Sequence, residues 1–176
     1  ANSNEISVTT LVGTTTYTEG AWTNGTPTAD LDAIIAENFT TTGDLSVKSL
    51  TINSGKVFTV ATGTTLTIVT TLTNNAGLTG FVVESDAVVL QNSTTTNTAL
   101  ATVKRNSTPL FRQDYTLWSS PVFEPNLRNF SPQTLFNRFS TYDFSTSENG
   151  GYKQEINNNE EVLSKKFVNA KGYLIR

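Results

Sequence analysis

The clearest strand pattern of the chain lies in residues 45–68, which read LSVKSLTINSGKVFTVATGTTLTI. Apolar and small polar side chains alternate in 50–52 (LTI) and again in 66–68 (LTI). Because successive side chains of a strand point to opposite faces, this alternation predicts half-buried strands. Residues 53–55 (NSG) and 62–63 (TG) separate the strands with residue types that favour turns. The sequence therefore predicts short strands and frequent turns.

The same pattern recurs along the chain. Residues 50–52 are repeated at 66–68, sixteen positions later, and another sixteen positions lead to 82–84 (VVE). A fixed spacing built from short strands is typical of a solenoid, in which each coil stacks on the next. We therefore expect a short parallel β-helix in which the first residues of these repeats point inward and lie in register. An antiparallel sandwich also requires short alternating strands at regular spacing, and it is the alternative.

Residues 29–37 fit either a helix or a strand. The segment contains helix-forming residues, and Thr28 is a suitable N-cap. The run 32–35 followed by 39–41 also has the pattern of a strand, a turn and a second strand. We expect the strands.

Composition divides the chain near residue 108. Residues 1–100 contain two Lys and eight acids, a net charge of −6, whereas 101–176 contain ten Lys and Arg against seven acids, a net charge of +3. Thr becomes sparse after Thr108, and most Phe, Tyr and Arg residues follow it. We expect an all-β chain with two domains: a Thr-rich β-helix over 1–108 and, over 109–176, the start of an incomplete β-sandwich truncated at the C-terminus.

The overall composition argues against several classes of function. The 176 residues include 32 Thr, 18 Asn and 15 Ser, but no Cys, no Met and no His. Such a chain has no Ser-His-Asp triad, no Cys nucleophile and no zinc site of the usual nitrogen and sulfur ligands. A net charge of −3 argues against nucleic acid as a partner. The apolar runs are far shorter than the ~20 residues of a membrane helix, so we expect no membrane insertion by this segment.

The ends of the sequence suggest how the protein is processed. The chain starts at Ala1 and has no Met, as in a mature protein whose secretion signal has been removed. It ends in 170–176 (AKGYLIR), which has the pattern of a strand without a polar tail. We therefore expect the N-terminal part of a longer secreted protein.

Several stretches carry a resemblance to a known group of proteins. They are 21–28 with 32–35, 41–55, 103–121, 137–139 and 171–176. In these stretches the chain resembles the N-terminal region of large secreted proteins of Bacteroidota, especially flavobacteria. The most specific run is YTLWSSP at 115–121. The resemblance implies export by the type IX secretion system and a location outside the cell or on its surface, without implying a particular biochemical activity.

Trp22 and two Thr rows are the candidate ligand contacts. An exposed indole can stack on a sugar, and Trp22 lies in a stretch rich in Gly, Thr and Pro. The pairs Thr65/Thr67 and Thr71/Thr73 would form a flat array for ice or another crystalline surface if they aligned on one face of the coils. Thr is also a common strand residue, which explains the same rows without a ligand.

The sequence predicts a non-catalytic structural or adhesive module, with secretion or surface-assembly proteins as partners and glycans as further candidates. Basic residues in or beside the coils have no acidic cluster at ligand spacing, and ordinary turn chemistry explains the acids. We expect no catalytic residue, no cofactor and no metal. An extracellular carbohydrate-binding or polysaccharide-degrading β-helix is the alternative. Because an open solenoid end pairs with other chains, we expect residues 6–12 to cap one end.

Overall fold

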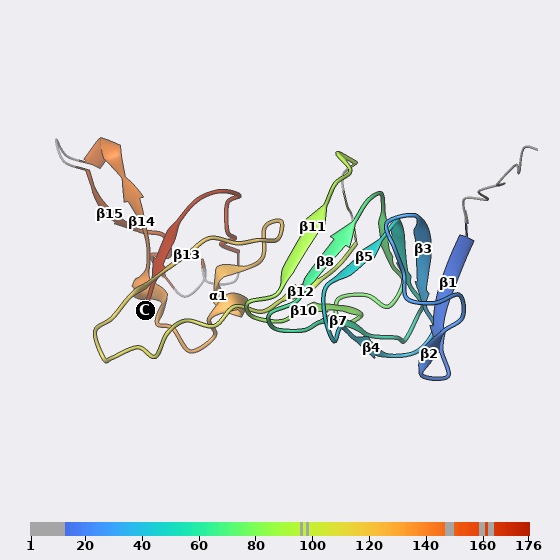
Figure 1. Ribbon diagram of the computed structural model, residues 1–176. Helices are drawn as coiled ribbons and strands as arrows, with labels where there is room; N and C mark the ends of the chain where they lie inside the picture. The colour runs from blue at the N-terminus through green and yellow to red at the C-terminus, as the bar shows by residue number, and fades with distance from the viewer. Residues whose placement is uncertain (1–12, 96, 98, 147–149, 159–160, 162–163) are drawn as a thin grey trace, which may run out of the picture. The chain divides into compact units, whose positions relative to one another are not determined.

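The computed structural model describes residues 13–95, 97, 99–146, 150–158, 161 and 164–176. Contacts divide the chain into two compact units, Ala1–Arg105 and Asn106–Arg176. The first unit is a parallel β-solenoid, and the second contains an antiparallel sheet with short helical turns (Figure 1). The described part of the chain is therefore all-β apart from these turns.

The described strands of the first unit form three sheets, which line the sides of the solenoid. The first sheet has the order β2-β1-β3-β6-β9, with bounds Ala21–Trp22, Gly13–Thr18, Leu31–Ile35, Ser49–Ile52 and Leu72–Asn74. The second sheet has the order β12-β10-β7-β4, with bounds Thr102–Val103, Phe81–Val83, Phe58–Val60 and Phe39–Thr40. The third sheet has the order β11-β8-β5, with bounds Val88–Gln91, Thr65–Ile68 and Leu45–Val47.

The chain visits these sheets in a fixed order. Strands β3, β4 and β5 lie in the first, second and third sheets, and β6, β7 and β8 repeat that sequence one turn later (Figure 1). Neighbouring strands are parallel except in the β1–β2 hairpin. Within the described residues the winding makes about four turns. The predicted parallel β-helix is confirmed, and the sandwich alternative does not apply to this unit.

The repeat seen in the sequence does not correspond to one turn. Leu50 pairs with Leu72 in the first sheet, and Leu66 pairs with Val89 in the third sheet, so both turns are longer than the repeat. The turn from β3 to β6 is shorter than either of them. The expected stacking of Leu50, Leu66 and Val82 is therefore wrong, because these residues lie in β6, β8 and β10, each in a different sheet. The sequence repeat arises because strands on different sides of the solenoid share the same alternation of apolar and polar residues.

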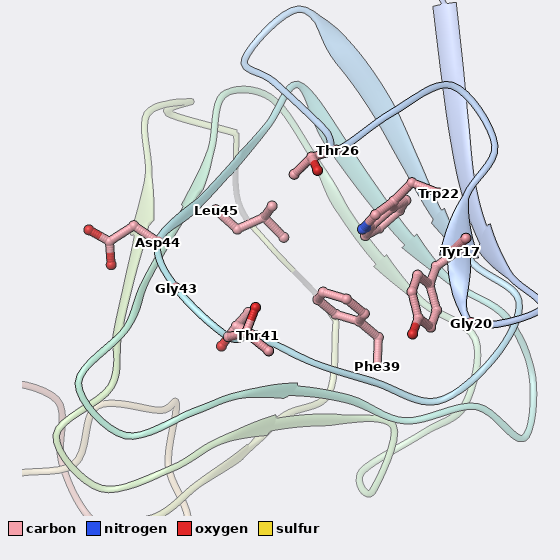
Figure 2. A pocket seen from close by; sticks show the side chains of 11 residues that line it. Tyr17, Gly20, Trp22, Thr26, Phe39, Thr41, Gly43, Asp44 and Leu45 are labelled. Atoms are coloured by element: carbon pink, nitrogen blue, oxygen red, sulfur yellow. The ribbon is translucent and has the colours of Figure 1, made fainter.

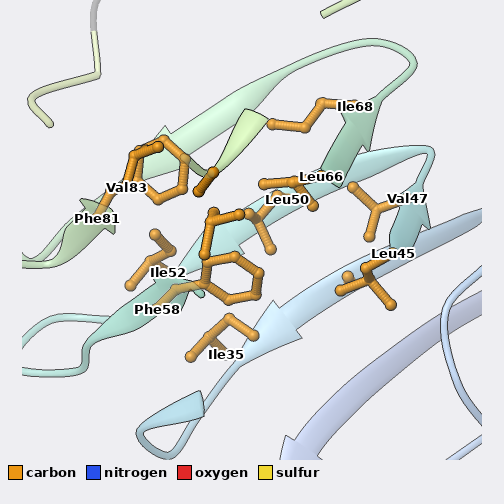
Figure 3. Packing of buried hydrophobic residues seen from close by; sticks show 13 residues of the cluster. Ile35, Leu45, Val47, Leu50, Ile52, Phe58, Leu66, Ile68, Phe81 and Val83 are labelled. Carbon is orange, nitrogen blue, oxygen red and sulfur yellow. The ribbon is translucent and has the colours of Figure 1, made fainter. Parts of the chain in front are cut away.

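Inward side chains of successive turns stack into columns. In the second sheet the ring of Phe58 lies between those of Phe39 and Phe81, with centroid distances of 5.5 and 6.0 Å. Leu50 from the first sheet and Leu66 from the third are fully buried in the same interior (Figure 3). Burial of apolar surface therefore continues from one turn to the next, which is what stabilises a solenoid.

Residues 31–35 form strand β3, as expected, and not a helix. Ala33 and Ile35 are buried, while Ile34 between them is partly exposed. This burial pattern requires a period of two, which a helix does not provide. The cap expected in residues 6–12 lies outside the described residues.

In the second unit the described strands form an antiparallel sheet in the order β13-β16-β14-β15. Their bounds are Thr116–Trp118, Tyr173–Ile175, Phe139–Asp143 and Gly151–Gln154. The helical turns are α1, Leu127–Phe130, and two 3-10 turns at Phe136–Arg138 and Phe144–Thr146. The buried core of this unit joins side chains of strands β14 and β16 to side chains outside the sheet, and it consists of Leu127, Phe139, Ile156, Phe167, Tyr173 and Ile175. This sheet is the sandwich-like segment expected for the second part.

No described helix is long and apolar enough to span a membrane.

Candidate functional site

A pocket of about 400 Å³ lies in the first turns of the solenoid (Figure 2). It opens where β4 and β5 are the outermost described strands of the second and third sheets. Its lining residues are Tyr17, Gly20, Ala21, Trp22, Thr26, Phe39, Thr41, Thr42, Gly43, Asp44 and Leu45. The pocket therefore lies between the β1–β2 hairpin with its following segment and the corner that joins β4 to β5.

The β1–β2 hairpin supplies an aromatic wall. Glu19 and Gly20 both have positive φ, 53° and 73°, which allows the strand to reverse direction in two residues. The hairpin pairs Tyr17 with Trp22, and their rings meet edge to face with centroids 5.3 Å apart. The ring of Phe39 contacts both, at 4.6 Å from Tyr17 and 5.2 Å from Trp22. This wall begins the column of aromatic rings that continues into the core.

Buried Thr15 fixes the segment that follows Trp22. Its hydroxyl donates to the carbonyl of Gly25 at 2.9 Å and accepts the N–H of Asn24 at 3.2 Å. Thr15 is fully buried, so water does not compete for these bonds. The next residue, Thr26, is held over the pocket, where Figure 2 shows its side chain between Trp22 and the opposite wall.

The loop between β4 and β5 forms the opposite wall. The buried Thr41 hydroxyl accepts the N–H of Ala61 at 2.8 Å and lies 2.7 Å from the hydroxyl of Thr64. One carboxylate oxygen of Asp44 accepts the N–H of Thr65 at 2.8 Å. In Figure 2 the Asp44 carboxylate lies at the rim and points away from the aromatic rings. The wall is therefore held in place by the following turn of the solenoid.

The aromatic wall also carries polar groups that are available to a ligand. Neither the indole N–H of Trp22 nor the hydroxyl of Tyr17 hydrogen-bonds to another described residue. Figure 2 shows the indole nitrogen facing the space between the two walls. A ligand in this space would find apolar ring surface and a hydrogen-bond donor on the same side.

The chemical groups of the lining indicate what the pocket can hold. Among the described lining residues Asp44 is the lone carboxylate, whereas glycoside hydrolysis ordinarily uses a pair. The described residues contain no cluster of three or more acidic side chains able to hold a metal ion. The pocket offers aromatic surface, hydroxyl groups and one anionic group, which are the components of a binding site.

The structure places the sequence candidates at separate locations. Trp22 lines the pocket, whereas Thr65 and Thr67 lie on β8 in the third sheet. Thr73 lies on β9 in the first sheet, directly after Thr71 and Leu72. The pairs Thr65/Thr67 and Thr71/Thr73 therefore lie on different sides of the solenoid, because β8 and β9 belong to different sheets.

The outward surface of the first sheet is mixed. Thr73 lies opposite Thr51, but the next position along that row is Ile34. In the neighbouring row, Asp32 pairs with Lys48 at 3.8 Å. Apolar and charged side chains interrupt the hydroxyl groups, so this sheet does not present a uniform Thr array.

Sequence reasoning missed the partners of Trp22. Tyr17 lies five positions earlier, and the turn residues between them were a usable hairpin signal. Phe39, Thr41 and Asp44 come from the next part of the coil, where strand alternation does not indicate which earlier residue they face. A pocket made by successive turns has no local sequence signature.

Comparisons with known proteins identify a family without an activity. The family model described as a domain of unknown function, DUF8693, matches residues 9–176, and the chain belongs to this family. No curated protein and no solved structure gives a significant match. The interpretation of the pocket therefore depends on its own geometry.

Proposed function

We propose that the chain is a non-catalytic structural and adhesive module of a secreted cell-surface protein. The observation that carries the proposal is the continuous core, in which Phe39, Phe58 and Phe81 stack across successive turns. Each turn of a solenoid pairs its backbone with its neighbours and buries its apolar side chains against them. Such a body is stiff and presents its surface and its end pocket at fixed positions.

The adhesive part of the proposal is supported by the pocket. Its aromatic wall and opposite wall are each fixed by hydrogen bonds or ring contacts within the solenoid. Preformed sites lose little conformational entropy when they bind, which favours attachment. A stiff module with a preformed site at one end is suited to holding a surface ligand.

The proposal extends to location and partners. The resemblance to type IX secretion cargo of Bacteroidota supports export and display on the cell surface. Secretion or surface-assembly proteins would then contact the module, and glycans would be its ligands. The net charge of −3 gives no support to nucleic acid as a partner.

A carbohydrate-degrading β-helix is the second candidate. The pocket favours the carbohydrate part of this alternative, because it contains the candidate Trp22 beside hydroxyl groups. The lone carboxylate among the described lining residues weighs against the degrading part. We therefore favour binding without turnover.

Adhesion and turnover are measured together to test the proposal. Beads coated with the full chain are tested for retention on bacterial envelope fractions and glycan-coated surfaces, and the soluble chain is incubated with a panel of polysaccharides. If the proposal holds, the beads are retained, proteases cleave the chain slowly, and the polysaccharides yield no new reducing ends or unsaturated products. Product accumulating in proportion to protein and time would contradict it. Rapid cleavage within residues 31–91, or an absence of retention on every surface, would do so as well.

A further inference from the structure

We propose that the pocket binds the ring of a neutral sugar carried on a surface glycan. The inference specifies the ligand class of the adhesive module and rests on that proposed function for its biological setting. The volume of about 400 Å³ lies within the ~300–1,000 Å³ of typical small-ligand pockets. Exposed residues such as Thr42 and Gly43 form the rim, so a sugar can enter while the rest of its glycan stays in solvent.

The first argument is the aromatic wall. A pyranose ring has a face of C–H groups, which packs on aromatic surface, and hydroxyl groups around its edge, which require hydrogen-bond partners. Tyr17, Trp22 and Phe39 supply the aromatic surface. A purely apolar ligand would cover the same surface but leave the Trp22 indole N–H without a partner, which is unfavourable.

The second argument is the set of hydroxyl groups around the pocket. Thr26 lies over the space in Figure 2, and the lining residue Thr42 belongs to the loop between β4 and β5. Neither side chain hydrogen-bonds to another described residue. Together with the Trp22 N–H, these hydroxyl groups add donors and acceptors to the lining. This arrangement matches a ligand with polar groups distributed around a ring.

The third argument is charge, which selects neutral sugars over acidic ones. The Asp44 carboxylate lies at the rim, and a carboxylate oxygen of Glu37 lies 3.1 Å from the backbone nitrogen of the lining residue Gly20. No Lys or Arg is among the described lining residues. A uronic acid would therefore meet like charge without a cation to compensate for it.

The test follows the fluorescence emission of Trp22 itself. The chain has two Trp, so Trp118→Phe leaves Trp22 as the single indole. Trp118 lies in the second unit against Phe130, at a centroid distance of 4.9 Å, and Phe retains an aromatic ring there. The W118F protein is titrated with the methyl glycosides of glucose, galactose, mannose and N-acetylglucosamine. Sorbitol serves as a polyol without a ring, and glucuronic acid as an acidic sugar.

We expect a saturable shift of Trp22 emission with at least one methyl glycoside, at micromolar to millimolar concentrations. Sorbitol should give none, and glucuronic acid should bind at least about tenfold more weakly than the best neutral glycoside. Asp44→Asn in the W118F protein should reduce the difference in affinity between the neutral glycoside and glucuronic acid, because it removes the charge at the rim while conserving shape.

A blocking variant links the signal to the pocket. Thr42→Tyr places a ring at the rim of the pocket, and Thr40→Tyr places the same ring at a nearby residue that does not line the pocket. Both residues are exposed, so neither change overpacks the core. We expect T42Y to weaken glycoside binding at least about tenfold and T40Y to leave it unchanged.

The inference is overturned if no glycoside shifts the emission, if sorbitol acts equally, or if T42Y and T40Y have the same effect while both remain folded by circular dichroism. If T42Y does not fold, the inference is overturned when D44N keeps the same preference for neutral glycosides over glucuronic acid. If no sugar binds but the coated beads still adhere, the proposed sugar site is wrong while the proposed adhesive function is retained. A peptide that shifts Trp22 emission in place of every sugar would also overturn it.

Discussion

Phe58 shows how one side chain stabilises two junctions between turns. It is fully buried and lies between the rings of Phe39 and Phe81. Phe58→Ala removes both contacts and leaves a cavity that rigid neighbouring turns fill poorly. We predict a loss of about 3–5 kcal/mol in the free energy of unfolding, measured by urea denaturation followed by circular dichroism.

Phe111→Ala is the control for this prediction. Phe111 is 83% exposed, so removing its ring should change the free energy of unfolding by less than about 0.5 kcal/mol. Equal effects of the two substitutions would contradict the stacked core.

Glu155 makes the stability of the second unit depend on pH. Burial raises the pKa of its carboxyl, but the hydrogen bond from the Thr141 hydroxyl and the Lys171 ammonium, 2.9 Å away, together lower that pKa below its usual value. A carboxyl with a lowered folded-state pKa contributes its full stabilisation above the unfolded pKa, about 4.3. This contribution is lost as the pH falls through the folded-state pKa.

We predict that Glu155→Gln flattens the pH dependence of unfolding. The free energy of unfolding is measured from neutral pH to below the unfolded pKa for the natural chain and for E155Q, and the difference between them should shrink as the pH falls. Glu124→Gln is the control, because Glu124 forms an exposed pair with Lys166 at 3.4 Å. An unchanged pH profile in E155Q would refute the assignment.

At the scale of elements, buried hydroxyl groups hold the corners of successive turns together. The Thr41 hydroxyl accepts the N–H of Ala61 at 2.8 Å and lies 2.7 Å from the Thr64 hydroxyl. Thr41→Val conserves shape but leaves the Ala61 N–H without its acceptor. We predict a cost of about 1–3 kcal/mol in the free energy of unfolding.

Thr59→Val tests whether any Thr of these strands would behave in the same way. Thr59 lies on β7 with its side chain directed outward between two buried neighbours, so its hydroxyl is served by water. Its replacement should change stability by less than about 0.5 kcal/mol. If T59V costs as much as T41V, the corner hydrogen bond is not the cause.

Strands were predictable from sequence, but their neighbours were not. Alternation in 50–52 and 66–68 correctly indicated β6 and β8. Alternation identifies the buried side of a strand, however, and carries no information about the strand beside it. The length of a turn also varies, from the short step that pairs Ala33 with Leu50 to the longer one that pairs Leu66 with Val89. A fixed spacing therefore does not identify the neighbouring strand.

The pocket was predictable only in part for the same reason. Trp22 was a candidate from sequence because it lies near Gly25 and Pro27. The positions of the other lining residues Phe39 and Asp44 depend on how the next turn is wound, which period-two patterns leave open. Local chemistry was therefore readable, whereas the stacking that assembles the site required the structure.

At the scale of the whole molecule, the exposed segment at the boundary of the two units should be the first site of proteolysis. Lys104, Arg105 and Arg112 are exposed, whereas Lys48 and Lys56 are partly buried beside strands. We predict that trypsin first cleaves after Lys104, Arg105 or Arg112 and that the fragment containing the solenoid persists, as followed by mass spectrometry. Replacing the three exposed residues with Gln should slow the first cleavage, and early cleavage at Lys48 or Lys56 would contradict a rigid solenoid.

The register of the turns is the central claim, and engineered cysteine pairs test it most directly because the natural chain has no Cys. Thr51 lies opposite Thr73 in adjacent parallel strands, whose spacing of about 4.8 Å is within disulfide range. Thr67 follows Thr51 by sixteen positions but lies in a different sheet. Under mild oxidation, we predict a disulfide in T51C/T73C and none in T51C/T67C, measured by mass spectrometry after proteolysis. A disulfide in T51C/T67C and none in T51C/T73C would contradict the solenoid described.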